Sequence, residues 1–340
     1  MKRRKFIQSA ALTAAASVHI TRDLFAKGNQ NVYGHNGMKY ALDTQWCKAD
    51  PLKNPVNDCH EMVQDASGKI ILLTNETKNN VMMFNTSGKL LSTWGNSYPG
   101  AHGLTLWHDT LFITDTAKHQ VYKTSLDGKK TMLTIDPPKE DNLYPKPESF
   151  VPTEVAVTDQ GDFYIADGYG SQYILHYDKD GKFLNYFGGR GDGDEHLDNA
   201  HGITIDRRNG LPTLLITDRT RNCFKTFTMD GKFIGKIELP GACVCRPVIK
   251  GDHLYAAVLR SPTLAAEDTG FVTILDKQNR VVSNLGGTAP EYDASGKITA
   301  MSQADKIFKN PHDVCVDKDE NLYVAQWASG KVYPYKFNRV

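Results

Sequence analysis

Three features are scarce in this 340-residue chain, and each scarcity excludes a class of protein. An excess of one charge is missing, because 40 Lys and Arg residues stand against 39 Asp and Glu residues. A net charge of +1 gives no overall attraction to nucleic acid, which we do not expect as a partner. No apolar run beyond the N-terminal region approaches the length of a membrane-spanning helix, so we expect no transmembrane segment in the mature protein. None of the six cysteines shows the two-residue spacing of a zinc knuckle or redox pair.

The first 26 residues are typical of an export signal. Arg3 and Arg4 precede an apolar pair, and an Ala-rich run follows over Ser9–Val18. At about ten residues this run is too short to span a bilayer. The twin arginines favour the Tat route, so we expect a signal peptide over residues 1–26 and a periplasmic or otherwise exported protein. Residues 27–340 then form one domain.

A repeated phrase occupies most of that domain. Each copy has a short apolar strand, an Asp/Gly turn, a second apolar strand, a polar loop and a third strand. Several copies add a fourth strand after a D-G-K or S-G-K turn. One such unit cannot bury both faces, so copies must stack. Six copies of about 52 residues each predict an all-β fold, a six-bladed β-propeller around a central channel.

The two ends of the chain predict how the ring closes. The last copy reaches Val340 after only three strands, whereas Lys39–Trp46 is a strand without a repeat of its own. We therefore expect this N-terminal strand to join the last blade. Because blade edges in propellers are short and protected, we expect a monomer.

One repeat position, just before each innermost strand, concentrates histidine. Its occupants in chain order are His60, His102, Thr153, His201, Arg246 and His312. Four of the 11 histidines thus share a position that has six copies. Because equivalent positions on successive blades lie at one height around the axis, these side chains should converge at one channel mouth. Imidazole suits Zn, Cu, Fe or Ni, and three histidines with an open position form a catalytic zinc arrangement.

Two further candidates follow the second strands of adjacent blades. Tyr169 lies in the loop after the third copy's second strand, and Arg219 lies at the same place in the fourth copy. A phenol and a guanidinium in neighbouring loops can serve as acid/base group and anion clamp.

At these residues the sequence resembles the NHL-type propellers, and most of all the peptidyl-α-hydroxyglycine α-amidating lyases. The resemblance covers roughly residues 55–338. Its most specific segments are 101–104 (AHGL), 114–123 (TDTAKHQVYK), 152–157 (PTEVAV), 166–172 (ADGYGSQ), 200–203 (AHGI), 217–219 (TDR) and 310–314 (NPHDV).

The resemblance implies two metals and two catalytic side chains. Zinc is implied on His102, His201 and His312, with Tyr169 as the catalytic tyrosine and Arg219 as an active-site arginine. A structural calcium in the channel is implied on the side chain of Asp313 and the backbone carbonyls of Leu104 and Met62. Oxygen ligands of this kind suit calcium, whereas imidazoles suit zinc.

The sequence departs from the family at three positions. Asn75 replaces a second family arginine, and Gly170 replaces the cysteine that follows the family tyrosine. His60 adds a fourth imidazole, which as a fourth ligand would close the site or shift its preference from zinc toward copper. Arg246 is a candidate to supply the missing positive charge at the active site.

Three functions are compatible with these residues. The first is an exported metal-dependent lyase that splits a peptide ending in α-hydroxyglycine into a peptide amide and glyoxylate. The second is a non-catalytic propeller that binds a peptide, sugar or partner protein and uses its metal structurally. The third, a calcium-dependent lactonase, fits less well because its channel ligands are carboxylates and amides rather than imidazoles.

Overall fold

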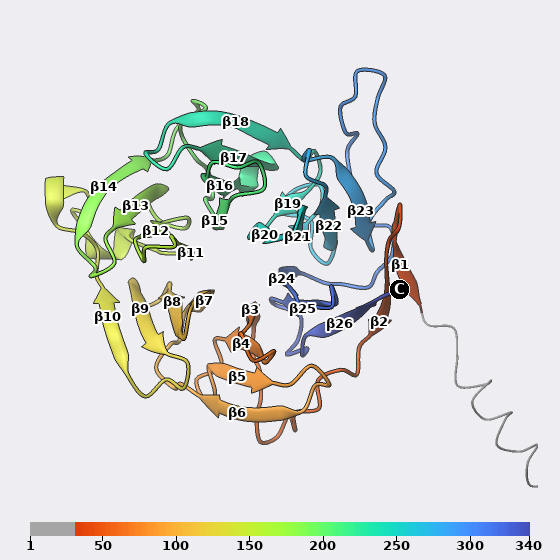
Figure 1. Cartoon of the computed structure of the whole chain (residues 1–340), viewed down its shortest axis with the longest axis horizontal. Coiled ribbons are helices and arrows are strands. Elements are labelled where there is room, and N and C mark those ends of the chain that lie inside the picture. Colours follow the sequence, from red (N-terminus) through yellow and green to blue (C-terminus); the bar gives the residue numbers. More distant parts are fainter. Residues whose placement is uncertain (1–30) are drawn as a thin grey trace, which may run out of the picture. The chain divides into compact units, whose positions relative to one another are not determined.

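The computed structural model describes residues 31–340, which form six β-sheets around a common axis (Figure 1). Each sheet is one blade, and within it consecutive strands pair antiparallel from the axis outward. The predicted all-β, six-bladed propeller is confirmed. The predicted signal peptide and its boundary at residue 26 lie outside the described residues.

The first three blades have four strands each. Blade 1 contains β3 (Cys59–Gln64), β4 (Ile70–Thr74), β5 (Val81–Phe84) and β6 (Leu90–Trp94). Blade 2 contains β7 (Ala101–Trp107), β8 (Thr110–Asp115), β9 (Gln120–Ser125) and β10 (Thr131–Ile135). Blade 3 contains β11 (Glu154–Val157), β12 (Phe163–Ala166), β13 (Tyr173–Tyr177) and β14 (Phe183–Gly188).

Blade 4 keeps this pattern, and blades 5 and 6 vary it. Blade 4 contains β15 (Ile203–Asp206), β16 (Thr213–Asp218), β17 (Cys223–Phe227) and β18 (Phe233–Glu238). In blade 5 the inner strand is split into β19 (Cys243–Val244) and β20 (Val248–Lys250), which both pair with β21 (His253–Arg260), followed by β22 (Phe271–Leu275) and β23 (Val281–Leu285). Blade 6 contains β24 (Pro311–Val316), β25 (Leu322–Gln326) and β26 (Tyr335–Arg339).

The N-terminal strand closes the ring, as the sequence predicts. β2 (Met38–Asp43) pairs antiparallel with β26 and places Tyr40 opposite Arg339. The outermost strand of the last blade therefore comes from the other end of the chain. A hairpin adds β1 (Val32–His35) outside β2, a strand that the repeat pattern did not predict.

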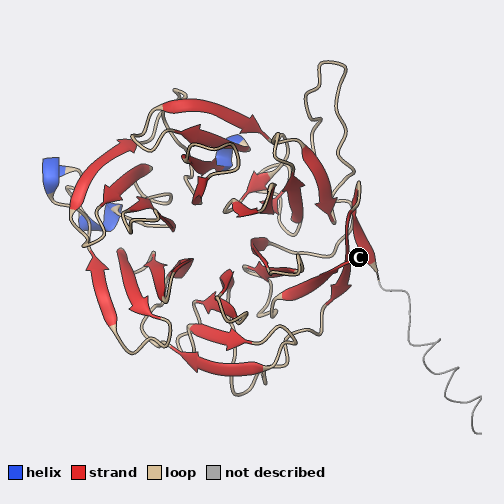
Figure 2. Ribbon diagram, viewed as in Figure 1, coloured by secondary structure: helices blue, strands red, loops and turns tan. Residues whose placement is uncertain are grey.

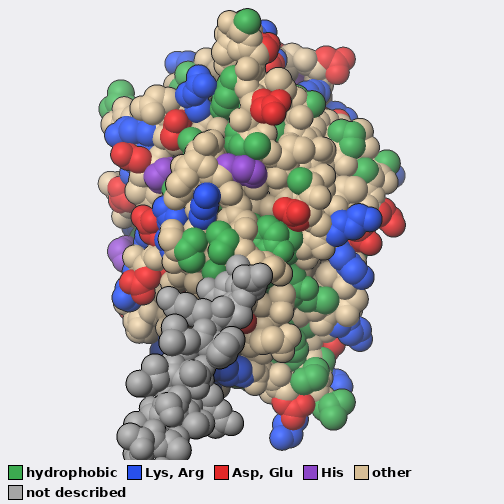
Figure 3. Space-filling model, turned by 90° about the vertical axis from the view of Figure 1, so that its right-hand side faces the viewer, with side chains coloured by type: hydrophobic (Ala, Val, Ile, Leu, Met, Phe, Trp, Pro, Cys, Tyr) green, Lys and Arg blue, Asp and Glu red, His purple; other side chains and the backbone are tan. Residues whose placement is uncertain are grey.

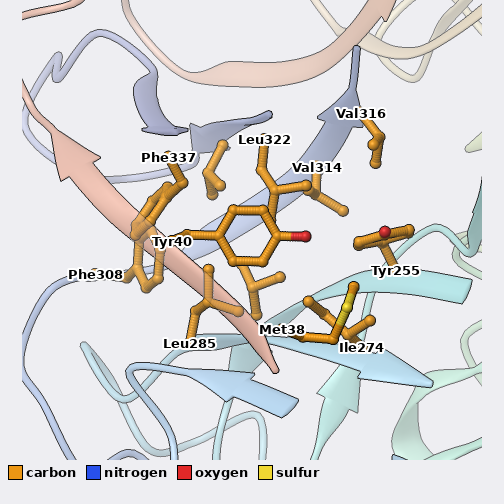
Figure 4. Packing of buried hydrophobic residues seen from close by; sticks show 12 residues of the cluster. Met38, Tyr40, Tyr255, Ile274, Leu285, Phe308, Val314, Val316, Leu322 and Phe337 are labelled. Carbon is orange, nitrogen blue, oxygen red and sulfur yellow. The ribbon is translucent and has the colours of Figure 1, made fainter. Parts of the chain in front are cut away.

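Apolar side chains fill the spaces between neighbouring blades. The cluster between blades 5 and 6 (Figure 4) joins the ring closure to the core, because Tyr40 of β2 is fully buried among residues such as Tyr255, Leu285 and Phe337. Strand alternation sends one face of each blade against the preceding blade and the other against the following one. The stacked core holds the inner strands, and hence the residues that face the channel, in fixed relative positions.

Helix is confined to short turns in the described part of the chain (Figure 2). These are the 3-10 turns η1 (Glu140–Asn142), η2 (Pro147–Ser149) and η3 (Arg219–Arg221), and none of the helices in residues 31–340 could cross a membrane. The long insertion after β23 projects outward from the ring (Figure 1), so its tip does not cover the channel. On the side shown in Figure 3, acidic and basic side chains are interspersed.

Candidate metal centre and active site

Bulges in three inner strands turn histidines toward the channel. The pairing register shifts at His60 in β3, at His312 in β24, and at His102 and Gly103 in β7. An extra residue of this kind bends the strand and re-aims a side chain. Gly103 is required beside His102, because a Cβ there would lie 2.4 Å from the Thr153 carbonyl oxygen of the next blade.

The structure brings the four predicted histidines together. The ring centroids of His102 and His312 are 4.9 Å apart, and both rings contact His60 at 5.0 and 4.9 Å. The same two rings contact His201 at 4.8 and 4.7 Å. Two triangles of imidazoles therefore share the edge between His102 and His312, and each triangle is a candidate three-histidine site.

The nitrogen positions of the first triangle fit a metal ion, and in the second triangle one pair of nitrogens is close. His60, His102 and His312 each offer one nitrogen, and these nitrogens all lie within 4.8 Å of one another. The Nε2 atoms of His201 and His312 are 3.1 Å apart. Two imidazole nitrogens bound to one tetrahedral zinc lie roughly 3.3 Å apart, given zinc–nitrogen distances of about 2.0–2.1 Å. The His201–His312 pair is thus spaced like two ligands of one ion.

The charge state of the cluster also suits a metal. Burial lowers the pKa of His60 to about 3 and holds the pKa values of His102, His201 and His312 well below the ordinary histidine value. The imidazoles are therefore neutral near pH 7, as ligation requires. His102 Nδ1 donates to the Thr153 carbonyl and His312 Nδ1 to the His60 carbonyl, which leaves the Nε2 lone pairs of both rings facing the cluster.

Tyr169 stands at the edge of the cluster and links it to Arg219. Its hydroxyl donates to His102 Nε2 at 3.1 Å and accepts a hydrogen bond from Arg219 Nη2 at 3.0 Å. Although 41% of the residue is exposed, the hydroxyl points inward. Burial raises the pKa of the Tyr169 phenol, and the nearby guanidinium opposes this rise.

The loop that carries Tyr169 is tightly fixed. Asp167 accepts hydrogen bonds from the backbone amides of Val151 and Ser171 and from the hydroxyl of Tyr144, which lies in the insertion before blade 3. A Cβ on Gly170 would lie 2.1 Å from the Ser149 carbonyl oxygen and 2.2 Å from an Asp167 oxygen. Glycine in place of the family cysteine thus follows from local packing.

Arg219 is a buried cation whose neighbours are neutral. Its guanidinium is 3.3 Å from the Asn199 side-chain oxygen and 3.7 Å from the Cys245 sulfur, in addition to its contact with Tyr169. Its Nε is buried and has no hydrogen-bond partner among the described residues. Burying a cation without a counter-ion is unfavourable, so this arrangement favours an anionic ligand.

A cavity of about 160 Å³ opens onto these groups. Tyr169, Arg219, Arg260 and His312 supply its polar lining, and Leu259, Leu264 and Trp327 supply its apolar lining. A ligand in this cavity would contact the phenol, the buried guanidinium and the histidine cluster at once. Larger hollows, of about 380 and 410 Å³, lie at the rim around blades 4 and 5, away from the histidines.

Arg246 does not lie at the active site, where it was predicted to supply a positive charge. It lies instead among the residues that were predicted to hold calcium. Its side chain turns along the channel, where Nε and Nη2 donate to Asp313 at 3.1 and 2.8 Å. Nη1 donates to the Leu104 carbonyl and Nη2 to the Met62 carbonyl, at 3.0 and 3.1 Å. The groups expected to hold calcium do converge, but around a guanidinium. Arg246 therefore does not face the cavity as a substrate clamp.

Two buried glutamates complete this charged layer, and neither was predicted from the sequence. Glu61 Oε2 is 3.5 Å and Glu154 Oε2 is 3.6 Å from the Arg246 guanidinium. Burial, together with Glu154, raises the pKa of Glu61 well above its ordinary value. The aligned repeats do contain a pattern that could have identified them. Glu61, Glu154 and Asp313 each directly follow the repeat position that carries the histidines.

Asn75 does not take over the role of the missing family arginine. Its amide nitrogen donates to Asp58 Oδ2, and its oxygen accepts hydrogen bonds from the Asp58 amide and the Asn57 side chain. The side chain thus stabilises the loop before β3. The positive charge in the cavity comes instead from Arg219 and Arg260.

The two triangles lead to a prediction about metal content. We expect His102→Ala, His312→Ala and His201→Ala to lose the bound metal, because the 3.1 Å pair joins His201 to the shared edge. His60→Ala should retain at least half an equivalent. Elemental analysis by mass spectrometry measures this, with His176→Ala as the control because that ring stacks on Tyr164, outside the cluster. Loss of metal in His60→Ala with retention in His201→Ala would assign the other triangle.

Relatives and solved structures agree with this architecture. Peptidyl-alpha-hydroxyglycine alpha-amidating lyase 2 of Drosophila melanogaster is 38% identical over 71% of this chain and 55% of its own length. Human NHL repeat-containing protein 3 is 24% identical over 87% of this chain and 84% of its own length. A gluconolactonase from Xanthomonas campestris has a TM-score of 0.58 at 10% identity, covering 88% of this chain and 89% of its own.

These matches differ in how much of each relative they cover and in what they show about this chain. The chain spans about half the length of the amidating lyases of Drosophila that it matches. The likeness to the gluconolactonase structure shows the fold alone. A protein family described as a 6-bladed beta-propeller matches residues 151–338, more than half of the chain. Together with the six blades seen in the structure, this match shows that the chain belongs to that 6-bladed β-propeller family.

Proposed function

We propose that this protein is an exported metal-dependent lyase that cleaves N-acyl α-hydroxyglycines into an amide and glyoxylate. One observation carries the proposal: the Tyr169 hydroxyl lies between His102 Nε2 and the Arg219 guanidinium, at 3.1 and 3.0 Å. A base, an anion-binding group and a metal-binding cluster are thus adjacent. The amidating-lyase names of the relatives support this class of reaction.

The proposal places the metal on His102, His201 and His312, as the family resemblance implies, and the group of His60, His102 and His312 is the alternative. When bound, a zinc or copper ion supplies Lewis-acid polarisation of the substrate hydroxyl, which lowers the pKa of that hydroxyl. Zinc is our first choice because neutral imidazoles and an open position suit it.

Arg219 holds the substrate carboxylate. Its Nε is without a partner among the described residues, and its Nη1 has only a weak sulfur acceptor, so the guanidinium keeps donors that a carboxylate can accept. The bound carboxylate would supply the counter-ion that the buried guanidinium lacks. Its attraction to Arg219 also orients the carbon that bears the hydroxyl toward Tyr169.

Tyr169 moves the proton. Arg219 stabilises the tyrosinate form, which lets Tyr169 Oη accept the proton of the substrate hydroxyl. The electron pair of that O–H bond forms the carbonyl of glyoxylate as the carbon–nitrogen bond breaks. The amide nitrogen leaves with the electrons of that bond and takes up a proton, so no oxidant or reductant is needed.

The apolar wall of the cavity fits the acyl part of the substrate. Leu259, Leu264 and Trp327 line the same cavity as the site's polar groups and would shield the breaking bond from water. A volume of about 160 Å³ suits a single compact group. Compounds with a short apolar acyl group should therefore be the better substrates.

Release of glyoxylate from α-hydroxyhippurate tests the proposal. We expect zinc-loaded protein to release glyoxylate and benzamide in equal amounts, and protein stripped with a chelator to be inactive until zinc or copper is restored. A loaded protein that shows no glyoxylate above the rate of spontaneous breakdown would remove the lyase proposal.

The fourth imidazole favours a second candidate function. If His60 joins His102, His201 and His312 on one ion, four protein ligands would close the site, and the propeller would bind a partner without catalysis. X-ray absorption spectroscopy of the loaded protein separates the two candidates. Four nitrogen ligands and no oxygen ligand would support the binding protein, whereas three nitrogens with a water oxygen would support the lyase.

A further inference from the structure

The channel contains an oxygen-rich cradle one layer away from the histidines. Both carboxylate oxygens of Asp313 and the backbone carbonyl oxygens of Met62 and Leu104 point to a common centre, where they contact Arg246 at 2.8–3.1 Å. Three separate blades supply these oxygens. Buried carboxylate oxygens of Glu61 and Glu154 lie just outside, at 3.5 and 3.6 Å.

Such a set of oxygens has the chemistry of a site for a hard divalent cation. Calcium takes six to eight oxygens from carboxylates, backbone carbonyls and water. Here, however, a side chain from blade 5 fills the centre. A guanidinium and a calcium ion cannot occupy the same place, so the residues present do not fit the ion that the family resemblance implies.

We infer that the Arg246 guanidinium permanently replaces a divalent cation at the centre of this channel. Its planar fork forms four hydrogen bonds to three acceptor groups, which no lysine could match with one nitrogen. The three surrounding carboxylates are neutralised in part by a charge that the chain itself carries. The channel of the propeller therefore needs no calcium.

The replacement also couples the channel to the metal centre. Met62 and Leu104 lie two residues after His60 and His102, and Asp313 directly follows His312. The Met62 amide donates to Asp313, and the Leu104 amide donates to Glu61. Arg246 thus ties together the three bulged strands that carry histidines. It acts as a positioning residue, because it is not among the residues that line the cavity.

Thermal unfolding with and without calcium tests this inference. We expect the wild-type Tm to change by less than about 1 °C between excess EGTA and 5 mM CaCl2, and calorimetry to detect no calcium binding. Arg246→Ala should lower the Tm in EGTA by roughly 10 °C, because it leaves buried carboxylates without their cation. Calcium should restore at least half of that loss and titrate as one site, because the oxygens are then free.

Two other variants separate this effect from a general loss of stability. Arg208→Ala removes another buried arginine, one that pairs with Asp206 in blade 4 outside the channel, and should lower the Tm with no response to calcium. Arg246→Lys should fold without calcium, because it keeps one positive charge in the cradle. A rise in wild-type Tm with calcium, a folded Arg246→Ala that ignores calcium, or a lysine variant that requires calcium would each overturn the inference. If Arg246→Ala does not fold in either buffer, the wild-type and lysine measurements decide.

Discussion

Phenylalanine at position 169 is expected to abolish most of the lyase activity without disturbing the metal centre. Loss of general base catalysis costs typically 10²- to 10⁴-fold in rate, so we expect kcat for α-hydroxyhippurate to fall by about that factor. The phenyl ring can keep the contacts with the rings of His102 and His201 at 5.0 and 5.7 Å. Metal content and Tm should therefore stay within the error of the wild-type values.

A second tyrosine provides the control for this experiment. Tyr186 on β14 is exposed to a similar degree, 40% against 41% for Tyr169, and lies on the outer strand of blade 3. Tyr186→Phe should leave kcat unchanged. An active Tyr169→Phe variant, with kcat within a factor of three of wild type, would exclude the phenol as the base while leaving the metal centre itself untouched.

Replacement of Arg219 by methionine is expected to have the second largest effect on activity. The loss should appear only with substrates that carry a free carboxylate. Removing one member of a buried, hydrogen-bonded charge pair costs about 2–5 kcal/mol, so kcat/KM for α-hydroxyhippurate should fall roughly 30- to 4,000-fold. The methyl ester of the same compound lacks the anionic charge. Its kcat/KM should be low in the wild type and nearly the same in the variant.

The stability of this variant gives an independent measurement. Because Arg219 has no carboxylate partner among residues 31–340, its removal relieves an uncompensated buried charge, and the Tm should stay constant or rise. Arg221→Met is the matched control, since Arg221 lies on the same 3-10 turn but pairs with Asp218 at 2.9 Å. That control should keep its activity and lose some stability. Equal losses on the acid and on its ester in Arg219→Met would contradict the role as carboxylate clamp.

Much of the site could be predicted because a propeller repeats its geometry. Once the copies are aligned, His60, His102, His201 and His312 fall at one height, and rotation about the axis brings them together. Tyr169 and Arg219 follow the second strands of adjacent blades, so their proximity also follows from the register. The ring closure was predictable for the same reason, since one blade lacked a strand and one strand lacked a blade.

The direction of individual side chains could not be predicted in this way. Arg246 shares the repeat position of the histidines, yet its long side chain extends along the channel to Asp313 instead of facing the cavity. The register identifies a Cα position, whereas the partner of a flexible arginine depends on which acceptors lie within reach. Those acceptors belong to blades 1, 2 and 6 and lie 67 to 184 residues from Arg246 in the chain.

The sequence by itself determined the number of blades, their order, the closing strand and the set of histidines, because each is a property of spacing along a repeated pattern. Only the tertiary structure decided which cation fills the channel, which guanidinium faces the cavity and how closely the imidazoles approach. These depend on bulges in β3, β7 and β24 and on contacts between blades, where a shift of one residue changes the neighbour of every side chain.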